Sequence, residues 1–180
     1  GCDGVMSEVE VYAKAYECEL FLNKRSFGRK KLGKECRCYF KVPYEEGVLS
    51  VKTYDDGGFL LGEASLKSAG KETVLQVSPE DESIAPGEIL YLPISYTDNE
   101  GILKPMEKHN VSVSVKGGSL LGLGNACSYN KDGYDKTKTF TYYGQALAVV
   151  KADEDASELE VEIKDERDRL RQIKMVLRQG

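Results

Sequence analysis

The sequence contains a single histidine, His109, and no tryptophan among its 180 residues. A Ser-His-Asp or Cys-His catalytic arrangement needs a histidine, so any such arrangement would have to use His109. No partner can be identified beside it, and we expect a surface or loop histidine. The sequence also lacks any stretch close to the roughly 20 apolar residues of a membrane helix, so we expect no membrane partner.

The five cysteines show none of the close spacings of a metal site. They are Cys2, Cys18, Cys36, Cys38 and Cys127. In a strand, Cys36 and Cys38 would lie on one face about 7 Å apart, beyond easy disulfide reach. We therefore expect buried free thiols that behave as small apolar side chains, and neither a metal nor another cofactor. The sequence leaves the compartment open, although an odd number of free thiols favours the cytoplasm.

Positive charge is in the minority, with 25 Lys plus Arg against 30 Asp plus Glu and a formal net charge of -5. Sequence-independent binding to nucleic acid depends on clustered Lys and Arg that release counterions. We therefore expect no nucleic-acid partner. The chain begins without Met and without the charged-then-apolar layout of a signal peptide, and we expect a fragment of a longer protein.

Apolar and polar residues alternate along most of the chain, a pattern that predicts half-buried β-strands. In the first part, strands are expected over residues 8–14, 17–22, 36–42, 47–54 and 59–66. Turn-forming residues separate these runs at spacings near ten, which predicts an antiparallel sandwich.

The small, polar segment 67–72 interrupts the alternation, and we place a domain boundary there. The predicted fold is all-β, with two tandem immunoglobulin-like antiparallel β-sandwiches over residues 1–69 and 70–180. In the second domain, strands are expected over 72–78, 88–97, 110–116 and 140–152. The C-terminal pattern fits both a strand pair and a helix. The all-β context favours strands at about 157–163 and 172–178.

Residues 117–138 have a different composition, with four glycines between Gly117 and Gly124 and then a polar tract. The glycines predict unusual backbone dihedrals or a close approach by other atoms, and the polar tract predicts a long surface loop. Gly122-Leu123-Gly124 is similar to the opening of a dinucleotide fingerprint. Because the third glycine is absent and no helix follows, a structural glycine-rich strand and turn is the better interpretation.

Carboxyl groups are numerous, but their arrangement does not predict a catalytic site. A retaining glycosidase needs two carboxyls about 5 to 5.5 Å apart. The dipeptide Asn99-Glu100 is similar to the Asn-Glu of some glycosidase sites, yet it lies in a hairpin-turn sequence, 97–101. A (β/α)8 barrel of about 250 residues does not fit in the chain. We therefore assign no catalytic residue.

Tyrosine is the abundant aromatic residue, with 11 copies. Sugar-binding sites stack aromatic rings on sugar faces, and tyrosine offers both a ring and a hydroxyl. A strand through Tyr142 and Tyr143 would place one ring on each side. The candidate contacts for a sugar or an active-site rim are Tyr129, Tyr134, Tyr142 and Tyr143. The alternative is that tyrosine serves as an ordinary strand residue.

Two groups of motifs resemble glycoside hydrolase family 2. Residues 9–12, 19–23 and 26–30 resemble the immunoglobulin-like domain that follows the catalytic barrel in many bacterial members, with the pattern V-x-V-Y and E-L-F-L-N-G-K-S-L-G. Here Lys24 replaces the usual Gly and Phe27 the usual Leu. Residues 115–125 and 143–152 resemble the C-terminal domain of the same family, and the two patterns occur in the family's order.

This resemblance implies the C-terminal region of a retaining, β-galactosidase-like enzyme whose catalytic barrel lies upstream and carries both carboxylates. The expected role of the fragment is non-catalytic. Its two sandwiches would brace the barrel or a homo-oligomer, and loop 117–138 would contribute to the active-site rim. A carbohydrate-binding module that uses the exposed tyrosines is the alternative.

Overall fold

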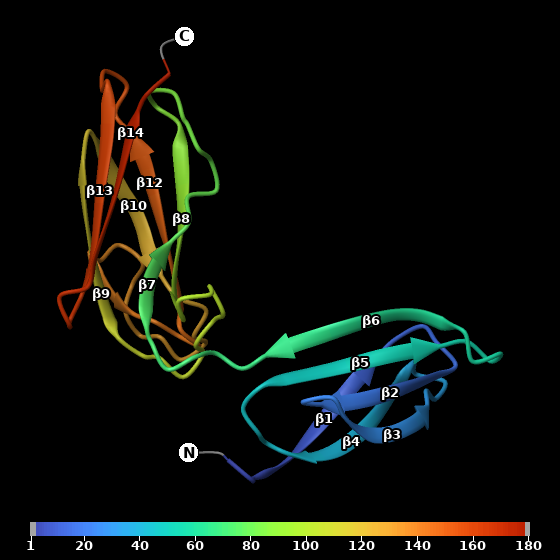
Figure 1. The fold of residues 1–180 in the computed structure, drawn as a ribbon. Coiled ribbons are helices and arrows are strands. Elements are labelled where there is room, and N and C mark those ends of the chain that lie inside the picture. Colours follow the sequence, from blue (N-terminus) through green and yellow to red (C-terminus); the bar gives the residue numbers. More distant parts are fainter. Residues whose placement is uncertain (1–2, 179–180) are drawn as a thin grey trace. The chain divides into compact units, whose positions relative to one another are not determined.

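The computed structural model describes residues 3–178, and within them it contains 14 strands and no helix (Figure 1). These residues form two compact units, one ending at Ser68 and one beginning at Ala69. Every strand pairing is antiparallel. The predicted all-β class with antiparallel sandwich domains is confirmed.

The first unit contains six strands in two sheets. They are β1 (Met6–Tyr12), β2 (Glu17–Leu22), β3 (Arg25–Lys31), β4 (Arg37–Pro43), β5 (Val48–Tyr54) and β6 (Leu60–Lys67). One sheet has the order β3-β2-β5-β6 and the other pairs β1 with β4. Alternate side chains of β1, β2 and β4 point inward and form a small core that includes Leu20 and Phe40.

Strand β3 was not among the predicted strands. Its sequence is mostly polar, and all of its residues except the half-buried Phe27 are exposed, because β3 lies at the edge of its sheet. An edge strand with no buried face carries no alternation for a sequence pattern to detect. The preceding turn at Asn23 and Lys24, both with positive φ, has the two-residue geometry that joins antiparallel strands.

The cysteine predictions hold in part. Cys18 and Cys38 are buried free thiols, and Cys127 is half-buried. Cys36 is exposed, contrary to expectation, because it lies in a turn before β4 with a φ of 56°. It therefore does not share a strand face with Cys38. Cys2 lies outside the described residues.

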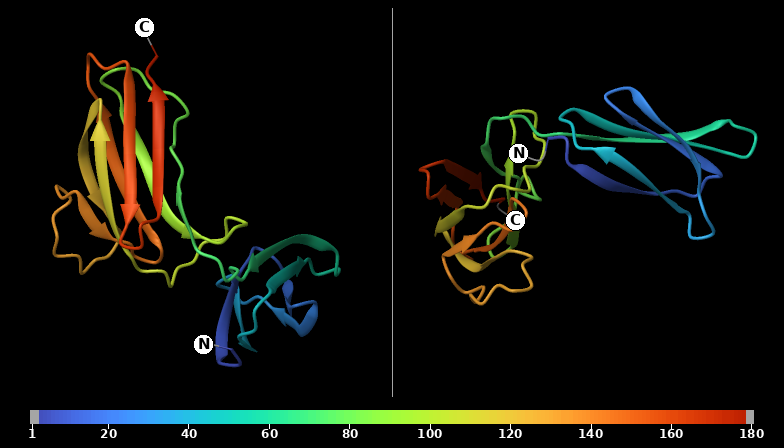
Figure 2. Two further views of the ribbon diagram at one scale, coloured as in Figure 1. Left: turned by 60° about the vertical axis from the view of Figure 1, so that its left-hand side comes forward. Right: turned by 90° about the horizontal axis from the view of Figure 1, so that it is seen from below.

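The second unit contains eight strands in two sheets (Figures 1 and 2). They are β7 (Val74–Val77), β8 (Ile89–Thr97), β9 (Asn110–Lys116), β10 (Gly118–Gly124), β11 (Lys138–Phe140), β12 (Gln145–Ala152), β13 (Glu158–Asp165) and β14 (Leu170–Val176). The sheet orders are β10-β12-β8-β7 and β11-β9-β13-β14. Both sheets contribute to one apolar core, and the predicted C-terminal strand pair is confirmed as β13 and β14.

Two expectations for this unit are corrected. The glycine-rich segment forms strand β10, in agreement with the strand-and-turn interpretation, so the loop expected over 117–138 is confined to the polar tract after this strand. A β-carbon at Gly117 would lie 2.0 Å from the Glu158 carbonyl oxygen, and one at Gly118 would lie 2.4 Å from the Lys151 carbonyl oxygen, so these glycines permit a close approach. The strand expected over 140–152 is divided into β11 and β12 by a tight turn.

No helix among the described residues is long and apolar enough to cross a membrane. Within the same residues, no group of three or more His, Cys, Asp or Glu side chains is placed to hold a metal ion. The Asn99-Glu100 dipeptide lies in a turn, as predicted, and the carboxylate of Asp98 accepts hydrogen bonds from the backbone N–H groups of Glu100 and Ile102.

Candidate functional site

The long loop after β10 folds back along that strand. The Asn125 side chain fixes the first residues of the loop. Its Nδ2 donates to the Phe140 carbonyl at 2.6 Å, and its Oδ1 accepts from the Cys127 N–H at 2.9 Å. The Leu123 N–H then donates to the Tyr134 carbonyl at 2.8 Å. These bonds bring Tyr134 beside β10, ten residues after the strand ends.

A tight turn brings two further tyrosines to the same region. Tyr142 and Gln145 exchange backbone hydrogen bonds of 2.9 and 3.0 Å. The residues between them, Tyr143 and Gly144, have φ values of 48° and 72°, as in a two-residue type I′ hairpin. The rings of Tyr142 and Tyr143 meet edge to face with centroids 4.4 Å apart. They therefore do not lie on opposite sides of a strand, because this segment is a turn.

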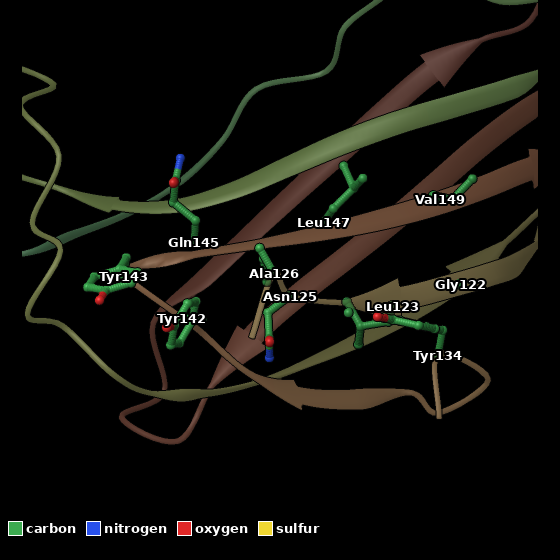
Figure 3. A pocket seen from close by; sticks show the side chains of 12 residues that line it. Gly122, Leu123, Asn125, Ala126, Tyr134, Tyr142, Tyr143, Gln145, Leu147 and Val149 are labelled. Carbon is green, nitrogen blue, oxygen red and sulfur yellow. The ribbon is translucent and has the colours of Figure 1, made fainter. Parts of the chain in front are cut away.

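The loop and the turn together form an open groove with a volume of about 570 Å³ beside β12 (Figure 3). Its lining residues are Gly122, Leu123, Gly124, Asn125, Ala126, Tyr134, Tyr142, Tyr143, Gln145, Ala146, Leu147 and Val149. Three of the four candidate tyrosines are thus brought together. The fourth, Tyr129, lies outside the lining and is 88% exposed.

The chemistry of the groove suits binding rather than proton transfer. Its lining has aromatic and aliphatic surface, the amides of Asn125 and Gln145, and three phenol groups, but no carboxyl or imidazole. The hydrogen bond with the neighbouring Tyr143 raises the pKa of Tyr142 above its usual value. Glycoside hydrolysis by paired carboxyl groups therefore has no candidate residues in this groove.

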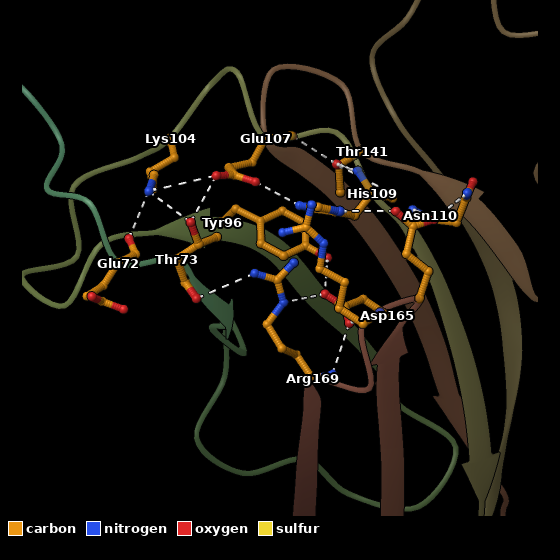
Figure 4. Close-up of polar contacts among 12 residues, drawn as sticks. Glu72, Thr73, Tyr96, Lys104, Glu107, His109, Asn110, Thr141, Asp165 and Arg169 are labelled. Carbon is orange, nitrogen blue, oxygen red and sulfur yellow. Dashed lines mark hydrogen bonds and ion pairs between the residues drawn. The ribbon is translucent and has the colours of Figure 1, made fainter.

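A second polar cluster surrounds His109 (Figure 4). The histidine lies in the loop just before β9, as expected, but it is only 4% exposed and so is not on the surface. Its Nε2 lies 2.7 Å from a Glu107 oxygen and its Nδ1 lies 3.1 Å from a Glu166 oxygen. Its ring also meets the Tyr96 ring edge to face at 4.8 Å. Glu166 is 57 residues away in sequence, so spacing offered no signal for this contact.

The two glutamates have lowered pKa values. Burial alone would raise the pKa of Glu107, but hydrogen bonds from His109 and Thr73 outweigh it. Hydrogen bonds from His109 and Asn110 lower the pKa of Glu166. Both carboxyl groups are therefore held ionised by partners in this cluster.

The carboxylate oxygens of the neighbouring Asp165 also have hydrogen-bond partners. Its Oδ2 accepts from the Arg169 Nε at 2.6 Å and from the Tyr96 hydroxyl at 2.9 Å, and its Oδ1 accepts from two backbone N–H groups of the β13–β14 turn. Burial opposes ionisation of Asp165, yet these bonds, led by Arg169, lower its pKa. Burial and Asp165 together raise the pKa of Tyr96.

Lys104 extends this cluster to the start of the unit. Its Nζ donates to the backbone carbonyls of Lys71 and Glu72, both at 2.9 Å, and to the Thr73 hydroxyl at 2.8 Å. The cluster thus joins the first residues of the unit to the loop before β9 and to the β13–β14 turn (Figure 4). Because each acidic group already has cationic or hydrogen-bonding partners, the arrangement is a structural network rather than a catalytic pair.

Two family models match the chain. The model described as "Glycoside hydrolase family 2 C-terminal domain 5" matches residues 75–174, within the second unit. A model described as "Domain of unknown function (DUF4982)" matches residues 4–59, within the first unit.

Individual relatives agree with the family match. The chain is 34% identical over 125 residues to a "Putative beta-glucuronidase" of Formosa agariphila, an alignment that covers 63% of this chain and 11% of that protein. A glycosyl hydrolase family 2 member from Bacteroides cellulosilyticus has a similar structure, with a TM-score of 0.91, 26% identity, and coverage of 99% of this chain and 24% of that one.

A β-glycosidase from Bacteroides vulgatus shares the fold, with a TM-score of 0.83 at 21% identity over 98% of this chain and 23% of that one. The chain thus spans between 11% and 24% of the length of these relatives. The motif resemblance to family 2 is confirmed. The chain belongs to glycoside hydrolase family 2, and its match is to a C-terminal domain of that family.

Proposed function

We propose that this chain is a non-catalytic part of a family 2 β-glycosidase and that its tyrosine groove contacts carbohydrate. The observation that carries the proposal is the convergence of Tyr134, Tyr142 and Tyr143, from two separate segments, on one groove. Aromatic rings supply stacking surface for sugars, while phenol and amide groups supply hydrogen bonds. The volume of about 570 Å³ falls in the usual range for small-ligand sites.

The parent reaction is assigned at the level of a β-glycosidase. The expectation of a β-galactosidase finds no support in the relatives described above, whose names are β-glucuronidase, β-glycosidase and glycosyl hydrolase. We take a β-glucuronide as the first substrate to test in the parent protein, because the relative at 34% identity bears that name. The catalytic carboxylates would come from an upstream barrel.

A bracing role for the barrel or for a homo-oligomer is the other half of the proposal. The outer face of β8 supports it, because the large apolar side chains of Ile89 and Tyr91 on that face are exposed. Loop 117–138, expected at the active-site rim, contributes one wall of the groove through Tyr134. The sugar-contacting groove and the rim loop are therefore proposed as one feature.

Carbohydrate binding can be tested by NMR titration of the 180-residue chain with methyl β-glucuronide, methyl β-galactoside and a β-linked disaccharide at millimolar concentrations. We expect shifts confined to groove residues. Replacing Tyr142 by Ala should weaken binding about fivefold, since an aromatic stacking partner contributes about 1 kcal/mol. The matched control is Tyr129→Ala, which removes an exposed ring outside the groove and should leave binding unchanged. Binding insensitive to Tyr142→Ala, or no shifts with the chain folded, would reject the sugar contact.

The non-catalytic half of the proposal has its own assay. The chain is incubated with chromogenic β-glucuronide and β-galactoside, and release of the chromophore is measured. We expect no turnover from the chain, and turnover from a longer protein that includes an upstream barrel. Hydrolysis by the purified chain would contradict this half without affecting the binding experiment.

A further inference from the structure

Two buried thiols face each other across the core of the first unit. The Sγ atoms of Cys18 and Cys38 lie 3.1 Å apart, about 1 Å more than the length of a disulfide bond. Cys18 is on β2, in the four-stranded sheet, and Cys38 is on β4, in the two-stranded sheet. The side chains are 0% and 7% exposed. This contact therefore joins the two layers of the sandwich.

The other described cysteines do not compete for this position. Cys36 is exposed in the turn before β4, and Cys127 belongs to the second unit. Among residues 3–178, Cys18 and Cys38 are the cysteine pair that the fold brings into contact. The sequence spacing of Cys36 and Cys38 did not reveal this pair, because spacing along one strand does not report contacts between sheets.

We propose that Cys18 and Cys38 are the site of an inter-sheet disulfide, formed by exchange with a low-molecular-weight disulfide or a thiol–disulfide oxidoreductase. The thiolate of one cysteine attacks the oxidant's disulfide, and one oxidant thiolate leaves. The second cysteine then attacks the resulting mixed disulfide at the protein sulfur and releases the second oxidant thiolate. The two protein thiols lose two electrons and two protons, which reduce the oxidant to two thiols.

The bond forms during folding, while the two thiols are still accessible to the oxidant. In the folded unit, burial, reinforced by the Cys38 thiol, raises the pKa of Cys18 to about 12. The attacking species is a thiolate, so the folded, buried thiol reacts slowly. Once formed, the same burial protects the bond from reduction.

The first unit has a structural use for such a bond. Its core cluster contains six buried side chains, and strand β6 is exposed along its whole length. Small domains with small cores gain most from a covalent link. The proposed bond closes a loop between residues 20 positions apart and joins a two-stranded sheet to its four-stranded partner.

The test compares one sequence in two redox states. The chain, with Cys2, Cys36 and Cys127 replaced by Ser, is unfolded in denaturant and refolded with either oxidised glutathione or dithiothreitol. We expect the oxidised sample to lose the mass of two hydrogen atoms, to yield a linked peptide pair containing Cys18 and Cys38, and to melt higher by on the order of 10 °C in its first unit.

A second set of samples controls for mispairing and for folding. With all native cysteines present, the same linked peptide pair should dominate after oxidative refolding. Cys18→Ala should abolish both the mass change and the redox-dependent shift in melting temperature, whatever its own stability. Free Cys18 and Cys38 after oxidative refolding, or predominant links to other cysteines, would overturn the proposal.

Discussion

The ring of Tyr134 lies directly against the backbone of Gly124. A β-carbon at position 124 would lie 2.2 Å from Cδ1 of that ring, far inside van der Waals contact. Two residues earlier, a β-carbon at Gly122 would come no closer than 3.8 Å to the Tyr134 carbonyl oxygen. Gly124 therefore sets the position of the Tyr134 ring in the groove wall, whereas Gly122 has room for a side chain.

Replacing Gly124 by Ala should displace the Tyr134 ring and change the groove. Tyr134 is 62% exposed, so its ring can swing outward, and the cost in unfolding free energy should be only about 1 kcal/mol. The ring resonances of Tyr134 should shift, and sugar-induced shifts at Tyr134 should disappear. Gly122→Ala is the matched control and should preserve both. Unchanged Tyr134 resonances in Gly124→Ala would contradict the predicted contact.

His109 should contribute measurably to the stability of the second unit. His109→Gln can keep one of its two carboxylate contacts, but it loses the other and the edge contact with Tyr96. Losing one hydrogen bond and the ring contact at this buried position should lower the unfolding free energy by about 2 kcal/mol, measured by urea denaturation. The comparison is Lys116→Gln, which removes a 3.8 Å ion pair with Glu160 at an exposed position and should cost less than about 0.5 kcal/mol. Equal losses would refute a special role for the buried histidine.

The same cluster should make the second unit sensitive to acid. The folded state lowers the pKa values of Glu107, Asp165 and Glu166 from 4.5, 3.8 and 4.5 respectively. A lowered pKa gives stability that is present above the unfolded-state value and is lost as the pH falls through the folded-state value. Melting temperature should therefore fall as the pH drops below about 4.5. Glu107→Gln should make this fall shallower, whereas Glu158→Gln, at an exposed strand position, should leave its slope unchanged.

Sequence patterns predicted the strands that have one buried and one exposed face. In β8 and β13, alternate residues are buried in the common core, and this is the arrangement that period-two alternation reports. Period-two alternation did not predict strands where backbone geometry, rather than burial of one face, determines the residue type. At the start of β10, Gly117 and Gly118 allow the close approach of neighbouring carbonyl groups, so glycines required by this approach interrupt the alternation.

The candidate site was predictable in residue type but not in geometry. Abundant tyrosine and a polar loop pointed to Tyr134, Tyr142 and Tyr143, yet their convergence depends on the Asn125 side chain and on a turn with Tyr143 in a left-handed conformation. Such turns usually carry Asn-Gly or Asp-Gly, so the sequence Tyr-Gly gave no turn signal. Likewise, the contact of His109 with Glu166 exists only once β9 and β13 have paired.

The turn that presents Tyr143 should depend on Gly144 for two separable reasons. Gly144 has a φ of 72°, and a β-carbon there would lie 2.5 Å from the Lys104 carbonyl oxygen. Gly101 has a similar φ of 83° with no atom within 4 Å of a β-carbon, so Gly101→Ala isolates the backbone penalty of about 1 kcal/mol.

Gly144→Ala adds a clash with backbone, which cannot move aside as a flexible side chain can. We expect it to cost about 1 to 3 kcal/mol more than Gly101→Ala in urea denaturation of the second unit. It should also separate the Tyr142 and Tyr143 rings, because the hydrogen bonds between Tyr142 and Gln145 close around this glycine. Equal destabilisation by the two variants would show that the Lys104 carbonyl group moves away from the new β-carbon. The turn would then constrain the groove through backbone conformation alone.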